Sequence, residues 1–287
     1  MFVIAGVTGN TGAVVADTLL AAKAPVRVIV RDAAKGAAWR AKGAEVAIAD
    51  LADVPALTAA LRGAQGAYLL VPPRPTAAEP LADNRAVAAA LAAAVAAARV
   101  PHVVLLSSIA AHQPDGTGPI VSVHVAEKLL AEVTQLTAVR AAYFMENWAG
   151  ALGMLAQGAL PTFIPRGLVI PMVATKDIGK TAAAALLEGP RGDARIELAG
   201  PRDYSADDVA AALTKLTGRP VAAADAPLDA VVPTFTSFGL SPAFAGLFRE
   251  MYAGLISGRV VWQGGAARAI RGQVDIADVL GPIVAGR

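Results

Sequence analysis

The sequence predicts an α/β protein with a doubly wound parallel sheet and a second, smaller lobe. Over the first 140 residues, short β-branched runs alternate with longer alanine-rich stretches, a rhythm typical of βαβ units that build a parallel sheet. Several of the short runs are apolar at nearly every position, as expected for strands covered by helices on both faces. A glycine-rich turn follows the first of these runs directly.

Six strands and five helices account for this rhythm. The expected strands span residues 2–5, 26–30, 45–48, 67–71, 102–106 and 138–140. The expected helices span residues 11–22, 35–42, 54–61, 81–98 and 119–133. Six strands connected in this way make a doubly wound sheet.

The rhythm breaks after about residue 150, where glycine and proline become frequent. Isolated strands are expected at 168–173 and 195–198, and helices at 177–187 and 205–216, with Ser205 as the N-cap of the last helix. We therefore expect a sheet domain at 1–150, to which 167–190 returns. Residues 151–166 and 191–287 are expected to form the smaller lobe.

Composition indicates a folded protein without metal or nucleic-acid chemistry. Hydrophobic residues make up 55% of the 287 positions and charged residues 17%, which allows a large core. The net charge is only +2 and no run of like charges suggests a nucleic-acid partner. The chain has no cysteine, and its three histidines, His102, His112 and His124, lack metal-ligand spacing, so we expect no bound metal.

The same composition argues against a membrane partner. The first apolar strand begins at Phe2, which leaves no room for a signal peptide and predicts a cytoplasmic protein. The long uncharged runs 148–165 and 230–248 contain prolines, and the alanine-rich run 86–98 is too short to span a bilayer. We expect a monomer or a homodimer.

The glycine-rich turn predicts a nucleotide site. It comprises Gly6, Val7, Thr8, Gly9, Asn10, Thr11 and Gly12, between the first strand and the first helix. Glycine lets the backbone approach a pyrophosphate closely, and the free N–H groups at the helix N-terminus attract its charge. The alternative interpretation is a simple turn. The strand–turn–helix context favours a dinucleotide-binding, Rossmann-type domain.

Residues that follow the second and third strands would bind the adenosine half of the cofactor. An acid at the end of the second strand selects a free ribose 2′-hydroxyl, whereas an arginine accommodates a 2′-phosphate. The chain offers Arg31 and Asp32, with Lys35 one turn later, which favours NADP(H) over NAD(H), unless the pair is simply a solvated surface feature. Asp50, followed by Leu51, could accept from the adenine amino group or cap the next helix.

Catalytic candidates should lie after the later strands, because ligands bind beyond the carboxyl ends of a doubly wound sheet. Val71 and Pro72 follow the fourth strand and Ser107 the fifth, while His124 and Lys128 share one face of the helix at 119–133. Lys128 could contact the nicotinamide ribose, and His124 or Ser107 could donate a proton. The plainer interpretations are a half-buried histidine, a solvated lysine and a serine that satisfies backbone groups.

Taken together, these motifs resemble the NmrA-like family of atypical short-chain dehydrogenases/reductases, which includes type 2 quinone reductases and azoreductases. The resemblance rests on the segments 6–12, 30–32, 106–108, 116–119, 139–147 and 250–272, with His124 and Glu127 between them. It implies that residues 6–12 bind pyrophosphate and that Arg31 contacts the 2′-phosphate. It also implies that the segment containing Tyr143, Phe144, Glu146 and Asn147 lines the nicotinamide end. No tyrosine stands four residues before a lysine, so the tyrosine-driven mechanism of typical short-chain dehydrogenases is not expected.

The sequence thus favours an NADPH-dependent reductase whose smaller lobe binds a small apolar substrate. Phe235, Phe238, Phe244, Phe248 and Trp262 could form the apolar pocket or ordinary core. Quinones, azo compounds and unsaturated carbonyl compounds would suit it, because they accept hydride with little acid catalysis. One alternative is a regulatory protein that senses NADP without turning it over, and another is an isomerase that retains tightly bound NAD.

Overall fold

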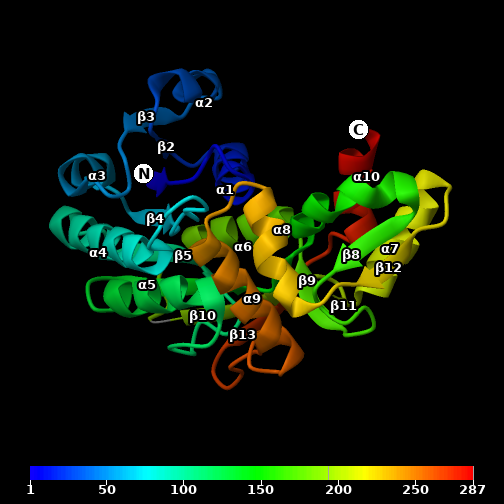
Figure 1. Cartoon of the computed structure of the whole chain (residues 1–287). Helices are drawn as coiled ribbons and strands as arrows, with labels where there is room; N and C mark the ends of the chain where they lie inside the picture. Colours follow the sequence, from blue (N-terminus) through cyan, green and yellow to red (C-terminus); the bar gives the residue numbers. More distant parts are fainter. Residues whose placement is uncertain (193, 287) are drawn as a thin grey trace.

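The central sheet confirms the predicted doubly wound α/β fold. The computed structural model describes residues 1–192 and 194–286. Within them the sheet has eight parallel strands in the order β13-β10-β6-β5-β4-β1-β2-β3 (Figure 1). These strands are β1 (Phe2–Ile4), β2 (Val26–Val30), β3 (Glu45–Ile48), β4 (Gly66–Leu69), β5 (His102–Ser108), β6 (Gln135–Ala141), β10 (Ala194–Ala199) and β13 (Arg268–Arg271).

Helices cover both faces of this sheet, because successive side chains of a strand point to opposite faces. The covering helices are α1 (Asn10–Ala21), α3 (Val54–Leu61), α4 (Pro80–Ala98), α5 (Val121–Ala131) and α6 (Thr175–Glu188). Phe2 and Ile4 of β1 share an apolar cluster with side chains of α1 and α6. Val3 and Ala5 pack on the other face with side chains of α3, α4 and α5. Between β2 and β3 lie only η1 (Ala33–Gly36) and α2 (Ala37–Ala41).

The strand order reverses direction beside β1. From β1 the chain first runs outward through β2 and β3, then returns to the other side of β1 for β4, β5 and β6. A crevice opens at such a reversal beyond the carboxyl ends of the strands, and it is where doubly wound folds bind ligands. The glycine-rich turn and the segment after β4 therefore share one crevice.

The sheet extends further than the sequence predicts. We expected the range 191–287 to belong wholly to the smaller lobe, but β10 and β13 within it pair with β6 and with each other. Ile196 and Leu198 of β10 are buried and continue the cluster under α6. Strand β13, with two arginines among its four residues, has no apolar pattern that marks it as a strand. It is a strand because it pairs with the open edge of β10.

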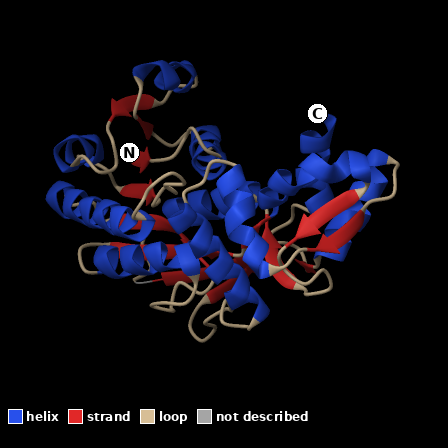
Figure 2. Ribbon diagram, viewed as in Figure 1, coloured by secondary structure: helices blue, strands red, loops and turns tan. Residues whose placement is uncertain are grey.

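The smaller lobe has its own apolar cluster and two small sheets (Figure 2). One sheet has the order β11-β9-β7 and the other pairs β12 with β8. Its elements are β7 (Tyr143–Phe144), η3 (Met145–Gln157), β8 (Ala159–Thr162), β9 (Ile170–Val173), β11 (Asp203–Tyr204), α7 (Ala206–Thr217), β12 (Ala222–Asp225), η4 (Leu228–Ala230), α8 (Val231–Ser237), α9 (Pro242–Ile256) and α10 (Ile276–Ala285). Ser205 caps α7 by accepting from the Asp208 N–H, as its position in the sequence predicts.

Helix α4 is longer than its alanine run suggests. With 19 residues, it is the one helix in the described part of the chain that is long and apolar enough to cross a membrane by length and composition alone. Its buried residues include Val87, Leu91 and Val95, which pack with side chains of α3, α5 and the sheet. A helix that packs in the core of a sheet protein is also long and apolar, and α4 is such a helix.

Helix α6 lies so close to α1 that position 179 has no room for a side chain. A Cβ on Gly179 would lie 2.5 Å from Cβ of Val14 and 2.9 Å from the carbonyl oxygen of Thr11. We expect Gly179→Ala to lower the free energy of unfolding by about 1–3 kcal/mol, because an added methyl group in a packed contact forces the backbone apart. Urea unfolding followed by circular dichroism measures the change.

The matched control is Gly246→Ala in α9, where a Cβ would meet open space. This change should raise the free energy of unfolding by up to about 1 kcal/mol, because alanine favours a helix more than glycine does. Stabilisation of the same size in both variants would contradict the close contact between α6 and α1.

Candidate functional site

The turn between β1 and α1 is built for close backbone approach. Gly6 adopts a φ of +69°, and a Cβ there would lie 2.6 Å from a methyl carbon of Leu70. A Cβ on Gly12 would lie 2.5 Å from the carbonyl oxygens of Ala5 and Gly6. Both positions therefore require glycine, and α1 starts directly against the end of β1.

The N-terminus of α1 presents its N–H groups to the crevice. Helix α1 begins at Asn10 after the N-cap Gly9, and no side chain caps it. Thr8, Gly9 and Asn10 are exposed. The hydroxyl of the buried Tyr68 donates to Thr11 Oγ1 at 2.9 Å and so fixes the orientation of the Thr11 side chain. Burial raises the pKa of Tyr68 far above its ordinary value. An uncapped helix N-terminus at this position is an anion site.

The charged residues after β2 divide into engaged and unpaired groups. Asp32 caps η1, since its Oδ1 accepts from the Ala34 N–H at 2.9 Å. Arg31 and Lys35 are exposed, and neither side chain makes a hydrogen bond or an ion pair with another described residue. Both cations are therefore available to a phosphate.

The residues after β3 and β4 form the neighbouring edge of the crevice. Asp50 accepts from the Ala52 N–H at 2.8 Å, while Asp53 is the N-cap of α3, so Asp50 stabilises a turn and does not cap the helix. Leu51 is half-buried against the cluster under α3 and α4. Val71 and Pro72 are also half-buried.

The loop after β4 is tied to the smaller lobe. The Ser241 N–H donates to the carbonyl oxygen of Pro75 at 2.8 Å. The Ser241 hydroxyl donates to the carbonyl oxygen of Ala77 at 2.6 Å. The crevice is thus bordered by the loop after β4 and by the start of α9.

In the 143–147 segment, Glu146 has one carboxylate oxygen bound and the other without a hydrogen-bond partner among the described residues. Its Oε1 accepts from the Thr175 N–H at 2.9 Å and from the Thr175 hydroxyl at 2.5 Å, which fixes the carboxylate to the start of α6. Its Oε2 is buried and has no hydrogen-bond partner in the described part of the chain. Helix α6 contacts α1 at Thr11, so the Glu146 carboxylate is held next to the helix that follows the glycine-rich turn. Its Oε2 can accept a hydrogen bond from a donor group of a bound cofactor.

Tyr143, the first residue of the same segment, lines a small cavity. Burial raises the pKa of Tyr143, while hydrogen bonds with Tyr252 and Asn147 act in the opposite direction. The cavity, of about 40 Å³, is lined by Tyr143, Ser108 and apolar residues of α9. Phe144 packs with the core under α1 and α6.

The aromatic residues expected to form a pocket pack mostly on one another. Ring contacts join Phe235 to Phe248 at 5.1 Å and Phe244 to Phe248 at 5.4 Å. Tyr252 belongs to the same group, whereas Phe238 is 67% exposed. Trp262 packs between the apolar clusters of the two lobes.

Ser107 belongs to a buried charge network. Its hydroxyl donates to Glu127 Oε1 at 2.5 Å, and Arg140 donates to both oxygens of Glu127 at 2.9 and 2.6 Å. Arg140 also donates to Gln263 at 2.5 Å. The side chains of Arg140 and Glu127 are only 4% and 12% exposed. The sequence analysis assigned no role to Glu127 and Arg140 as a pair. Opposite charges in two otherwise apolar stretches are a sequence pattern that can indicate a buried ion pair.

His124 and Lys128 do not face the glycine-rich turn. They line a groove between α5, β6 and β10 that contains no residue of that turn, and β5 and β4 separate β6 from β1. The reason is rotation along α5: Ser122 faces Asn84 of α4, and position 124 lies about 200° around the helix from 122. The structure therefore places His124 and Lys128 in this groove and not beside the glycine-rich turn, although Lys128 was expected to contact the cofactor.

The family model for NmrA-like proteins matches residues 1–251. The chain therefore belongs to the NmrA-like family. The resemblance inferred from the motifs is confirmed. An NAD(P)H azoreductase from Xenophilus azovorans is 30% identical over 264 residues, which cover 88% of this chain and 86% of that protein.

Solved structures share the fold of this NmrA-like protein over nearly its whole length. The NADPH complex of the NADPH-dependent quinone oxidoreductase QOR2 from Escherichia coli has a TM-score of 0.78 at 24% identity, covering 99% of this chain and 95% of that one. The NADP(H) complex of a triphenylmethane reductase from Citrobacter sp. has a TM-score of 0.79 at 19% identity, with coverages of 98% and 95%.

Removing one partner of the buried pair Glu127–Arg140 should destabilise the fold strongly. We expect Glu127→Gln to lower the free energy of unfolding by about 3–5 kcal/mol, because it leaves the Arg140 guanidinium buried without a counter-charge. Urea unfolding measures the loss. The control is Glu45→Gln, whose carboxylate is more than half exposed in its ion pair with Arg27, so that its loss should cost less than about 1 kcal/mol. Similar losses in both variants would contradict this difference.

Proposed function

We propose that the protein is an NADPH-dependent reductase that transfers a hydride to a small apolar acceptor such as a quinone, an azo compound or an activated carbonyl compound. The observation that carries the proposal is the uncapped N-terminus of α1 at the strand-order reversal, together with the unpaired Arg31 and Lys35. NADPH, when bound, supplies the hydride. NAD(P)H-dependent reduction is also what the names of the Xenophilus azovorans azoreductase and of QOR2 state for those proteins.

The chain's own groups bind the phosphates of the cofactor. The N–H groups of residues 10–12 receive the pyrophosphate, because no side chain caps them, whereas the Gly9 N–H already donates to the carbonyl oxygen of Gly6. Arg31 and Lys35 bind the ribose 2′-phosphate, since a guanidinium matches phosphate oxygens well. Asp32 is occupied by its cap of η1, and this favours NADP(H) over NAD(H).

The nicotinamide end lies toward the 143–147 segment and the loop after β4. Glu146 Oε2 accepts a hydrogen bond there, because it is buried and otherwise lacks a partner. Val71 and Pro72 form the apolar wall on the β4 side. Asn147 lies beside Tyr143, with which it hydrogen-bonds.

The acceptor binds on the side of Ser108, Tyr143 and the aromatic group of α9. Burial raises the pKa of Tyr143, so its hydroxyl stays protonated at neutral pH and can donate to an acceptor oxygen or nitrogen. Quinones and azo compounds need only this modest assistance. Ser107, His124 and Lys128 take no step in this proposal, because they lie around Arg140 and the α5 groove.

A second candidate, a protein that senses NADP without turning it over, is favoured by one observation. The cavity beside Ser108 and Tyr143 measures about 40 Å³, whereas an aromatic ring occupies a cavity of roughly 150 Å³. A sensor needs the phosphate turn and Arg31 but no open acceptor pocket. A reductase requires the smaller lobe to open at this cavity.

A panel of acceptors separates these two functions. The purified protein is mixed with NADPH and with benzoquinones, naphthoquinones and azo dyes, and the loss of NADPH absorbance is followed. We expect oxidation that depends on both protein and acceptor. Saturable NADPH binding in calorimetry without oxidation across the panel would instead support the sensor, and absence of NADPH binding would contradict both.

Arg31 should decide which cofactor binds. We expect Arg31→Ala to weaken NADPH binding by about 1.5–3 kcal/mol, the contribution of a charge-assisted hydrogen bond, and to leave NADH binding nearly unchanged. Calorimetric dissociation constants for the two cofactors measure the difference. Arg219→Ala, an arginine beyond α7, is the control and should alter neither. Equal losses for NADPH and NADH would remove Arg31 from the 2′-phosphate site.

A further inference from the structure

The groove between α5, β6 and β10 is a separate site from the cofactor crevice. It has a volume of about 390 Å³, and its floor is apolar, with Ala131 of α5 and Leu136 and Ala138 of β6. None of the residues of the glycine-rich turn, of the 143–147 segment or of the loop after β4 lines it. Volumes of this size are typical of small-molecule sites.

The charged side chains of this groove are unbalanced. Among the described residues that line it, the cations are Lys128, Arg140 and Arg195, and the one carboxylate is Glu127. Glu127 is fully engaged by Arg140 and Ser107. The side chains of Lys128 and Arg195 belong to exposed residues and have no hydrogen-bond or ion-pair partner among residues 1–192 and 194–286. Two cations at the rim of the groove therefore lack a counter-charge among the residues that the structure describes.

The ring nitrogens of His112 and His124 add polar groups to the groove, and their hydrogen bonds indicate where the ring protons lie. His124 Nδ1 donates to the carbonyl oxygen of Ala111 at 2.8 Å, because a carbonyl oxygen can only accept. The Gln113 amide lies 3.2 Å from His112 Nε2; with that amide donating, the proton of the neutral His112 ring lies on Nδ1. This Nδ1 is buried and has no partner in the described part of the chain. An unpartnered buried donor calls for an acceptor atom.

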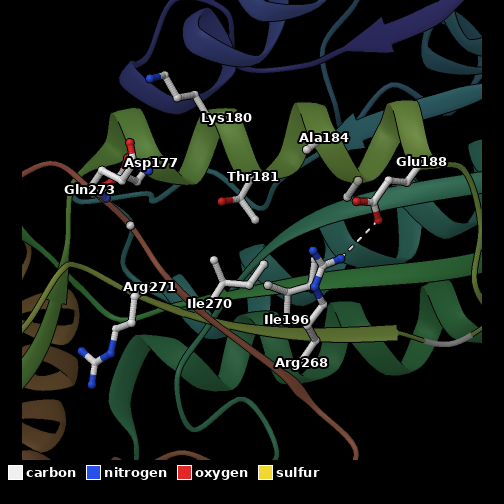
Figure 3. Close-up of a pocket in the computed structure, with 12 residues that line it drawn as sticks. Asp177, Lys180, Thr181, Ala184, Glu188, Ile196, Arg268, Ile270, Arg271 and Gln273 are labelled. Atoms are coloured by element: carbon white, nitrogen blue, oxygen red, sulfur yellow. Dashed lines mark hydrogen bonds and ion pairs between the residues drawn. The ribbon is translucent and has the colours of Figure 1, made fainter.

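A cavity on the opposite face of β10 has a different balance of charge. That cavity lies between α6, β10 and β13 and has a volume of about 330 Å³ (Figure 3). Its Glu188 pairs with Arg268 at 3.2 Å, and Arg271 points out of it and pairs with Asp203 at 2.5 Å. Lys180 projects away from it as well. Its charged groups are thus paired or turned outward, whereas those of the α5 groove are not.

We propose that the α5 groove binds a small organic anion, with a carboxylate or phosphate group between Lys128, Arg195 and His112 and an apolar body on Leu136 and Ala138. Both cations donate hydrogen bonds to the charged group, and His112 Nδ1 gains the acceptor that it lacks. Benzoate and phenyl phosphate are the simplest molecules with this combination. The proposal is independent of the proposed reductase activity, because it uses no group of the cofactor crevice.

Histidine NMR tests the proposal directly, because the chain contains only three histidines. Ring signals are recorded while benzoate, phenyl phosphate, inorganic phosphate or benzylamine is added, with and without saturating NADPH. We expect saturable shifts of His112 and His124 with benzoate or phenyl phosphate. The signal of His102, which is buried against Thr137 in β5 and β6, should not move.

A double variant supplies the second readout. We expect Lys128→Gln with Arg195→Gln to weaken benzoate or phenyl phosphate binding at least about tenfold, since each cation contributes a charge-assisted hydrogen bond. The matched control, Lys180→Gln with Arg268→Gln, changes the same residue types at the opposite cavity and should leave binding unaltered.

Four results would overturn the proposal. They are the absence of saturable shifts with both organic anions, binding of inorganic phosphate alone, binding of benzylamine as tight as that of benzoate, and equal affinity in the Lys128/Arg195 double variant. Because the histidine shifts are also recorded without NADPH, they do not depend on cofactor binding. Failure of NADPH to bind would therefore count against the reductase and leave the groove result intact.

Discussion

The arrangement of the whole site depends on two backbone contacts that exclude side chains. At Gly12, α1 meets the end of β1 so closely that a Cβ would overlap the carbonyl oxygens of Ala5 and Gly6. At Gly179, α6 meets α1 with no more room. The first contact directs the helix N-terminus into the crevice at the strand-order reversal. The second brings the start of α6, with Thr175 and the Glu146 carboxylate that it holds, to the same helix.

On the other face of the sheet, a buried ion pair holds neighbouring elements together. Glu127 of α5 and Arg140 of β6 are both almost inaccessible, and Ser107 of β5 joins them. Arg140 reaches Gln263, whose N–H donates to Glu197 of β10 at 2.9 Å. The network therefore links three neighbouring strands, one covering helix and the segment that leads to β13. Its polar groups satisfy one another, which is what allows charges to lie in the interior.

The sequence predicted what depends on local pattern. Apolar β-branched runs marked β1, β2 and β3, and the glycine spacing marked the turn at residues 6–12. Asp32 and Arg31 are adjacent in the sequence, but only the structure shows that one is engaged in a cap and the other is unpaired. Strand β13 was missed because its two arginines carry no periodic signal, and pairing with a distant strand made it.

The candidate catalytic residues show a different limit of sequence reasoning. His124 and Lys128 were correctly assigned to one helix face, since four residues separate them. Which way that face points depends on how α5 packs, and the contact of Ser122 with Asn84 of α4 turns it toward β10. Helical periodicity fixes relative positions along a helix, whereas tertiary contacts fix its rotation. The buried partner of Ser107 was missed for the same reason.

Strand β13 also ends the sheet in a way that bears on solubility. Its outer edge offers unpaired backbone groups, and such an edge can recruit a strand from another molecule. Arg268 and Arg271, at the two ends of this four-residue strand, are both more than half exposed as side chains. The strand is short, and charged side chains held in ion pairs stand at both of its ends, so its edge is a poor template for a strand of a second copy. The strand thus completes the sheet and at the same time protects it against growth into intermolecular β-structure.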